Sequence, residues 1–288
     1  MSKEPAPFVV RVVAPAGPVE AEDLDEGIRV LAERGFKVQE APHTRHRLGY
    51  LAGPDSARLE DLQDALDDPG VDAVWFARGG YGTTRLLPLL SPERIPAKPK
   101  LLLGYSDATA FFAWSQAIES LTSFYAPSVQ ELGREGVCNL ESVWAALECK
   151  PAPIPGSGPA APSGPHPVVG GCLSILSVLA GTPWAPDLRG HWLFLEDVGE
   201  PLYRLDRMLT HLHQAGWLDA VEGLVLGSFR GLGPGETAAD VAARARELLG
   251  PGKPLISGLP VGHVKGKHVL PLEEPALWNG SVLAFPSP

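Results

Sequence analysis

Cysteine is scarce in this chain, with only three among 288 residues. Cys138, Cys149 and Cys172 are odd in number and lack the spacing of metal ligands, which argues against a disulfide framework and a structural metal site. Such cysteines are typical of reduced, packed thiols in a cytoplasmic protein. We therefore expect neither a metal nor a cofactor.

Long apolar runs are also missing. The longest candidate, VVGGCLSILSVLAG (168–181), contains serines and is shorter than the roughly 18 residues that a membrane span needs. The apolar run near the start, FVVRVVAP (8–15), is broken by Arg11, which favours a first β-strand over a signal peptide. These patterns predict a soluble cytoplasmic protein that does not associate with a membrane.

Basic residues are fewer than acidic ones, at 24 Lys and Arg against 34 Asp and Glu, a net charge of −10. This balance argues against nucleic acid or an anionic membrane as the main partner, although a local basic pocket could still bind an anionic group. Hydrophobic residues make up 44% and charged residues 20%, as in globular proteins. The length suffices for one large domain or two ordinary ones.

The first half of the chain alternates strand-like and helix-like segments. Leu24, Ile28 and Leu31 share one face of a predicted helix, and a second helix is predicted from Ser56. Strand patterns surround these helices at 8–15, 36–40, 71–80 and 101–106. Strands separated in this way indicate βαβ units and a parallel sheet, with ligands at the carboxyl ends of the strands.

The composition changes near residue 150, where KPAPIPGSGPAAPSGPHP is dense in Pro, Gly and Ala. We interpret residues 151–167 as an extended linker between domains at 1–150 and 168–288. The second domain holds strand patterns such as WLFLEDV and GLVLGSF, a strand pattern in HVLPL, and a helix in ETAADVAARARELLG.

A possible nucleophile lies in LLLGYSDATAFF (101–112). The motif Gly104-Tyr105-Ser106-Asp107-Ala108 is similar to the nucleophile elbow G-x-S-x-G, with Ala in place of the last Gly. Such an elbow would present the Ser106 hydroxyl where a strand turns sharply into a helix. The alternative is that Ser106 or Asp107 simply caps the helix.

Glycines follow the neighbouring predicted strand in ARGGYGTTRLL (77–87). Gly79, Gly80 and Gly82 permit close approach of the backbone to a ligand, and one of their amides could form an oxyanion hole with the N–H of Asp107. A plain turn and a phosphate loop are the alternatives, although the spacing matches neither phosphate-binding glycine motif.

A serine nucleophile needs a histidine base and an acid that orients it. Of eight histidines, His263 stands out in LPVGHVKGKHVLPL because it follows an apolar run and a glycine. Glu196 ends the apolar run of WLFLEDV and is preferred over its neighbours Asp197 and Glu200. The alternatives are a solvated loop histidine and an exposed acid paired with a nearby arginine.

Taken together, these motifs resemble the LD-carboxypeptidases, serine peptidases that recycle cell-wall peptides and whose sister branch cleaves the peptide-nucleotide antibiotic microcin C. The matching segments lie in order over nearly the whole chain: GYLAG (49–53), FARGGYGTTRLL (76–87), LLGYSDATA (102–110), GGCLSILSVLAGTPW (170–184), LFLEDVGEPLYRLDRML (193–209), LGSF (226–229) and GHVKGKHVLPL (262–272).

The resemblance implies a flavodoxin-like parallel-sheet N-terminal domain, similar to class I glutamine amidotransferases, joined to a smaller β-rich C-terminal domain. It also implies a homodimer that needs no metal. Carried over position by position, Ser106 is the nucleophile, Glu196 the acid and His263 the base, with the oxyanion hole formed by the amides of Gly80 and Asp107.

Two positions depart from the family pattern. Cys172 stands where the family motif GGN has Asn, and Glu273 stands where LPLG has Gly. Neither belongs to the implied triad, but both could change the fit of a substrate or the local packing.

The sequence thus predicts a serine carboxypeptidase that cleaves an L,D-peptide bond of a murein peptide. Arg78 or Arg204 is expected to bind the free carboxylate of the substrate. One alternative keeps the triad and acts on an aminoacyl or peptidyl nucleotide, with Trp184 and Trp192 as a possible aromatic wall. The other is a non-catalytic small-molecule binding protein on the same scaffold.

Overall fold

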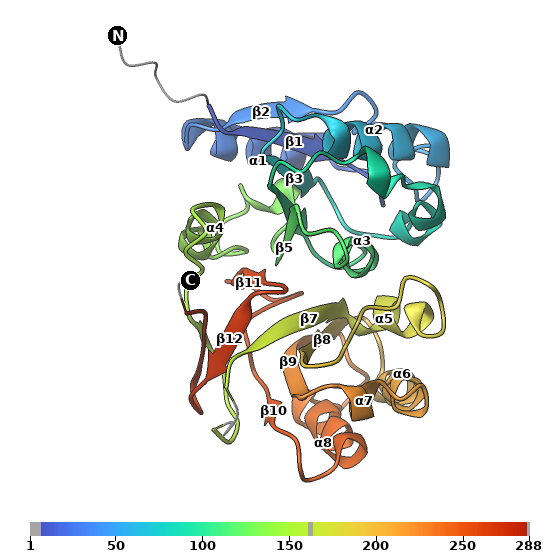
Figure 1. The fold of residues 1–288 in the computed structure, drawn as a ribbon, viewed down its shortest axis with the longest axis vertical. Coiled ribbons are helices and arrows are strands. Elements are labelled where there is room, and N and C mark those ends of the chain that lie inside the picture. Colours follow the sequence, from blue (N-terminus) through green and yellow to red (C-terminus); the bar gives the residue numbers. More distant parts are fainter. Residues whose placement is uncertain (1–6, 161–163, 287–288) are drawn as a thin grey trace.

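The computed structural model describes residues 7–160 and 164–286, which form two sheets with helices packed on them (Figure 1). The N-terminal sheet has the order β11-β5-β4-β3-β1-β2. Its parallel strands are β1 (Val9–Val13), β2 (Lys37–Glu40), β3 (Ala73–Phe76), β4 (Lys100–Gly104) and β5 (Leu121–Tyr125). The order 2-1-3-4-5 is that of flavodoxin-like folds, which confirms the predicted class.

Helices cover both faces of this sheet. They are α1 (Ala21–Glu33), α2 (Asp55–Asp67), α3 (Ala108–Ser115) and α4 (Leu140–Leu147), with short 3-10 turns at Thr83–Arg85, Leu87–Leu89, Pro92–Arg94 and Val129–Glu131. Alternate residues of β1 face opposite ways: Val10 and Val12 pack with Leu24 and Leu31 of α1, whereas Val13 packs in the α2 layer. The predicted apolar face of α1 is therefore buried in the core.

The C-terminal sheet has the order β10-β9-β8-β7-β12-β13-β6. Its parallel part comprises β7 (His166–Cys172), β8 (Trp192–Val198), β9 (Gly223–Arg230) and β10 (Leu255–Ile256); β12 (Pro275–Trp278), β13 (Val282–Ala284) and β6 (Ile154–Pro155) are antiparallel. Helices α5 (Leu173–Leu179), α6 (Leu202–Gln214), α7 (Trp217–Ala220) and α8 (Ala238–Leu249) belong to this half.

Two segments have roles that the sequence did not indicate. The expected linker 151–167 contributes to the C-terminal sheet, since β6 pairs with β13 and β7 begins at His166. The sequence predicts HVLPL as part of the C-terminal domain, yet its strand β11 (Leu270–Pro271) pairs with β5 of the N-terminal sheet. Burial explains both differences, since Ile154 and Leu270 are fully buried in these positions.

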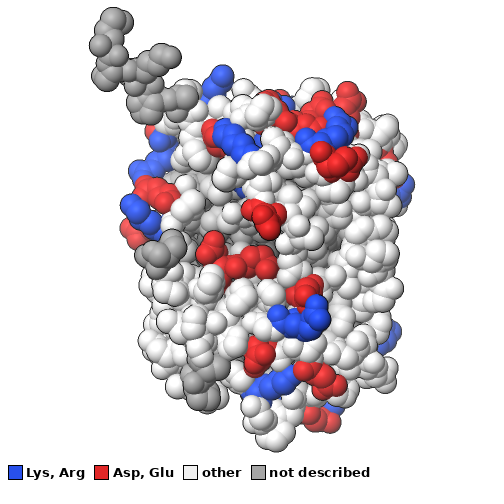
Figure 2. Space-filling model, in the orientation of Figure 1, with Lys and Arg blue, Asp and Glu red and all other residues white. Residues whose placement is uncertain are grey.

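Charged side chains are interspersed with broad uncharged areas on the face drawn in Figure 2. Many basic side chains pair with neighbouring acids; Arg45, for example, contacts Asp25 and Glu40. No helix of residues 7–160 and 164–286 has the length and apolar character needed to cross a membrane.

Glu273, which stands where the family pattern has Gly, adopts φ 65°, a conformation that favours glycine. Its Oε2 lies 3.1 Å from Nε2 of His191, and this hydrogen bond is the main reason that the pKa of His191 is raised despite partial burial. Because the pKa of His191 is higher in the folded than in the unfolded state, its protonation stabilises the fold. This stabilisation is fully present below about pH 6.5, the unfolded-state value, and is lost as the pH rises through the folded-state value.

We therefore expect Glu273→Gln to destabilise the protein more at pH 6 than at pH 8, by less than about 1 kcal/mol because the pair is partly solvated. Urea unfolding of the wild type, Glu273→Gln, His191→Gln and the double variant at both pH values measures this coupling. An equal coupling free energy at the two pH values would contradict the assignment.

Candidate active site

Ser106 lies at a sharp turn between β4 and α3. The strand ends at Gly104, where a Cβ atom would come within 3.1 Å of both Phe76 and Ala108. Ser106 itself has φ 60°, which is unusual and costly for a non-glycine residue. A strained serine between a buried strand and a helix is the geometry of a nucleophile elbow.

The glycine-rich loop after β3 packs directly against this turn. A Cβ on Gly79 would lie 3.0 Å from Cβ and 3.2 Å from Oγ of Ser106, so a larger residue would displace the serine. Gly80 has φ 113°, and the carbonyl of Gly79 accepts a hydrogen bond from the N–H of Gly17 at 3.0 Å. In the described part of the chain, the N–H groups of Gly80 and Asp107 donate to no acceptor.

The side chain of Asp107 connects the turn to the glycine loop. Its Oδ2 accepts a hydrogen bond from the N–H of Thr83 at 2.8 Å, and burial raises the pKa of the carboxyl group. The alternative role predicted for this side chain, capping the following helix, is wrong, because Asp107 makes no side-chain cap hydrogen bond. The buried carboxyl group also holds the two predicted oxyanion segments against each other.

Glu196 and His263 form a hydrogen-bonded pair in the other domain. Oε2 of the fully buried Glu196 accepts from the backbone N–H of His263 at 3.0 Å and lies 2.8 Å from its Nδ1. An ionised carboxylate only accepts hydrogen bonds, so Nδ1 carries the proton and Nε2 is left as the proton acceptor. A Cβ on Gly262 would lie 2.2 Å from Oε2, so this close approach requires glycine.

The strand that carries Glu196 is irregular at that residue. The pairing of β8 with β9 shifts register between Leu195 and Asp197, and such irregularities redirect side chains near active sites. As a result, the side chains of Glu196 and Asp197 are both buried, although they are consecutive in the strand, and they contact different groups. Oδ2 of Asp197 accepts from the N–H of Ser174 at 2.7 Å, which holds the start of α5.

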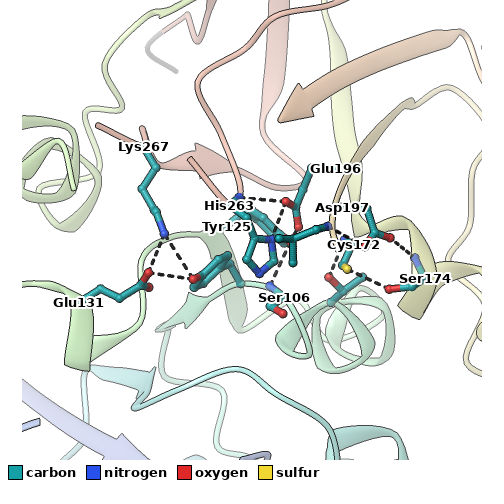
Figure 3. Close-up of polar contacts among 12 residues, drawn as sticks. Ser106, Tyr125, Glu131, Cys172, Ser174, Glu196, Asp197, His263 and Lys267 are labelled. Carbon is teal, nitrogen blue, oxygen red and sulfur yellow. Dashed lines mark hydrogen bonds and ion pairs between the residues drawn. The ribbon is translucent and has the colours of Figure 1, made fainter. Parts of the chain in front are cut away.

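A buried tyrosine brings the serine turn to this pair (Figure 3). The hydroxyl of Tyr125 donates to Oε1 of Glu196 at 2.6 Å and accepts from the N–H of Ser106 at 3.0 Å. The ring of Tyr105 also lies 4.8 Å from that of His263, centroid to centroid. No hydrogen bond joins Ser106 Oγ to His263 among the described residues; such contacts often tighten only when substrate binds.

A second buried network lies beside the site and was missed by sequence reasoning. Nζ of Lys267 donates to Oε1 of Glu131 at 2.7 Å, and the hydroxyl of Tyr105 donates to the same oxygen at 2.8 Å. Burial would raise the pKa of Glu131, but the Lys267 ammonium and the hydrogen bonds outweigh it and lower the pKa. The network joins the two domains next to the His263 ring.

Two family models match the chain: the LD-carboxypeptidase N-terminal domain over residues 10–126 and the LD-carboxypeptidase C-terminal domain over residues 166–277. The chain belongs to the LD-carboxypeptidase family. The resemblance predicted from the sequence is thereby confirmed.

Relatives in this family are similar to the chain over most of their length. A putative carboxypeptidase of Streptomyces coelicolor is 39% identical over 277 residues, 93% of this chain and 89% of the relative. The crystal structure of muramoyltetrapeptide carboxypeptidase from Oxalobacter formigenes is 30% identical, covers 97% of this chain and 100% of its own, and superposes with a TM-score of 0.84. The microcin C7 self-immunity protein MccF of Escherichia coli is 25% identical over 253 residues, 74% of this chain and 72% of the relative.

The position where LD-carboxypeptidases were expected to have Asn is occupied by a buried thiol. Cys172 lies opposite Glu196 in the pairing of β7 with β8, and its Sγ is 3.2 Å from Oγ of Ser174. Burial raises the pKa of this thiol well above its usual value, so it stays protonated at neutral pH. Among the described residues, the thiol makes no hydrogen bond to His263.

The expected substrate-binding residues lie in different surroundings. The guanidinium of Arg78 donates to the carbonyl of Pro18 and lies 3.7 Å from Glu20, while Arg204 lies 3.3 Å from Glu200. Trp192 is 1% exposed, in a core cluster shared by the two halves of the chain, and therefore cannot form an aromatic wall, which corrects that expectation.

Proposed function

We propose that the protein is a serine carboxypeptidase that removes the terminal D-amino acid from murein tetrapeptide. The observation that carries the proposal is the connection from the Glu196–His263 pair through Tyr125 to a serine held at φ 60°. The family and the muramoyltetrapeptide carboxypeptidase similarity support the choice of substrate.

In the proposed reaction, Nε2 of His263 takes the Ser106 proton as Oγ attacks the carbonyl carbon of the L,D-peptide bond. Glu196 holds the ring and stabilises its positive form. The N–H groups of Gly80 and Asp107 donate to the developing oxyanion. His263 then protonates the leaving amine of the D-amino acid, and water, activated by the same ring, hydrolyses the acyl-enzyme and restores Ser106.

Incubation of the protein with murein tetrapeptide tests this function, with released D-Ala measured by chromatography. The similarity to MccF favours one alternative, an aminoacyl or peptidyl nucleotide substrate, so an aminoacyl nucleotide and a peptidyl nucleotide belong in the same panel. Cleavage of the nucleotide but not of the tetrapeptide would select that alternative. If the protein binds one of these compounds but shows neither turnover nor labelling of a serine, it is a binding protein.

A carboxypeptidase must distinguish a chain end from an internal peptide bond, and an arginine can bind the terminal carboxylate through two parallel hydrogen bonds. Arg78 follows β3 and adjoins the oxyanion glycines, so we propose it as the reader, with Arg204 as second choice. Among the described residues, the one ion pair of Arg78 is its 3.7 Å contact with Glu20, and the Arg78 side chain is 38% exposed, so a substrate carboxylate can compete for it.

We expect Arg78→Ala to lower kcat/KM for tetrapeptide at least about tenfold. Wild-type enzyme should cleave a C-terminally amidated substrate poorly, and the variant should discriminate far less between the two forms. Arg204→Ala provides the comparison. Identical discrimination in the wild type and Arg78→Ala would rule out Arg78.

The cellular location and assembly remain predictions. We propose a cytoplasmic homodimer, in line with the family resemblance and the reduced cysteines. Light scattering after size-exclusion chromatography measures the assembly, and cell fractionation measures the location.

A further inference from the structure

Tyr125 occupies a position that the proposed chemistry leaves unexplained. It ends β5 in the N-terminal sheet, is 1% exposed, and bonds across the domain boundary to Glu196. Burial raises the pKa of its hydroxyl well above the usual value, so the group remains a donor. The same oxygen accepts the N–H of Ser106 at 3.0 Å, which makes it the link between nucleophile backbone and acid.

We propose that Tyr125 is a positioning residue that fixes the Ser106 turn and, through Glu196, sets the proton affinity of the catalytic base. This inference rests on the proposed function. Oε2 of Glu196 receives two bonds from His263, and Oε1 receives the bond from Tyr125. That third bond withdraws negative charge from the carboxylate, so its loss would strengthen the hold of Glu196 on a proton or on the charged imidazole.

Other titratable groups face the pair but are engaged elsewhere. Tyr105 bonds to Glu131, which is neutralised by Lys267; Asp197 bonds to the Ser174 amide, and Cys172 contacts the Ser174 hydroxyl. In the described ranges, Tyr125 is the one side chain besides His263 that hydrogen-bonds to Glu196. Substitution of Tyr125 therefore removes one of the hydrogen bonds to Glu196 and leaves those from His263, although it also removes the acceptor of the Ser106 N–H.

The test compares pH–rate profiles of the wild type and Tyr125→Phe. The profiles are measured both for tetrapeptide cleavage and for Ser106 labelling by a fluorophosphonate. Loss of a hydrogen bond to a charged group should lower kcat about 10- to 100-fold and move the midpoint of the acid limb up by about one pH unit. KM should stay within about twofold, because the hydroxyl does not touch substrate in the proposed reaction.

Replacing Tyr125 with 3-fluorotyrosine gives the opposite perturbation. The ring and hydroxyl are kept, so folding is preserved, and the more acidic phenol donates more strongly. The acid-limb midpoint should then move to lower pH. Opposite shifts for the two variants are the result expected from a tuned carboxylate, and a merely structural tyrosine would not produce them.

Thr109→Val is the matched control. Oγ1 of the buried Thr109 accepts from the N–H of Cys172 at 2.9 Å, so it also joins the domains but does not contact Glu196. Its midpoint should equal that of the wild type. The inference is overturned if Thr109→Val shifts the midpoint like Tyr125→Phe, or if Tyr125→Phe leaves it unchanged.

The labelling profile separates this inference from the proposed function. Wild-type protein that is labelled at Ser106 but leaves tetrapeptide intact would refute the substrate, while the labelling midpoints would still decide the role of Tyr125. Wild-type protein that is neither labelled nor active would refute both.

Discussion

Replacing Ser106 with alanine is expected to lower kcat on murein tetrapeptide by a factor on the order of 10⁶. The substitution removes the only atom proposed to attack the peptide bond. The backbone strain at φ 60° is similar for alanine and serine. The hydrogen bond to Tyr125 uses the backbone N–H of residue 106, which the substitution keeps, so the fold should be unchanged. Turnover and the thermal midpoint of unfolding measure the two effects separately.

Ser174→Ala serves as the control for the Ser106 experiment. Ser174 lies at the start of α5 near Cys172, and its loss should leave fluorophosphonate labelling intact. Labelling should disappear in Ser106→Ala only. If Ser106→Ala keeps more than about a hundredth of the wild-type turnover, the nucleophile must be another group.

The second large effect is expected for Glu196→Gln, about 10⁴ in kcat, by analogy with loss of the acid in other triads. An amide cannot stabilise a positive imidazole. Oε2 of Glu196 now accepts hydrogen bonds from the backbone N–H and Nδ1 of His263. If the amide nitrogen of the glutamine takes that place, it faces these two groups donor to donor. His263→Ala should cost more, because the base itself is removed.

Asp197→Asn controls for the loss of a buried acid from the same strand. Its oxygen can still accept from the Ser174 amide, while its NH2 group would face the N–H of Val198, which disturbs β8 locally. Asp197 makes no hydrogen bond to His263 among the described residues, so most activity should persist. Equal losses in Asp197→Asn and Glu196→Gln would point to a general disturbance of β8. Full activity in Glu196→Gln with loss in Glu200→Gln would assign the acid to Glu200.

Features that depend on neighbours in the sequence were predictable. The helical face of Leu24 and Leu31, the parallel strands and the Gly-x-Ser turn each arise from a local pattern, and the structure contains all three. Pairing Glu196 with His263 required knowledge of the family, because 67 positions separate them. Their catalytic roles remain predictions.

The networks around the site could not be predicted because they depend on long-range packing. Tyr125 and Glu196 are 71 positions apart, and Glu131 and Lys267 are 136 apart, with no periodicity to relate them. Strand β11 is only two residues long and contains a proline, so no strand signal identifies its partner. In each case, burial against a distant element decides the structure.

The return of β11 to the N-terminal sheet has a consequence for dissecting the protein. A fragment ending near residue 150 would lack this strand and leave β5 as an open edge, with the Phe124 and Tyr125 backbone unpaired on that side. Exposed strand edges recruit other strands, so such a fragment should self-associate even though its flavodoxin-like sheet is otherwise complete. We therefore expect that the boundary near residue 150 does not separate independent folding units, and the association state of such a fragment tests this.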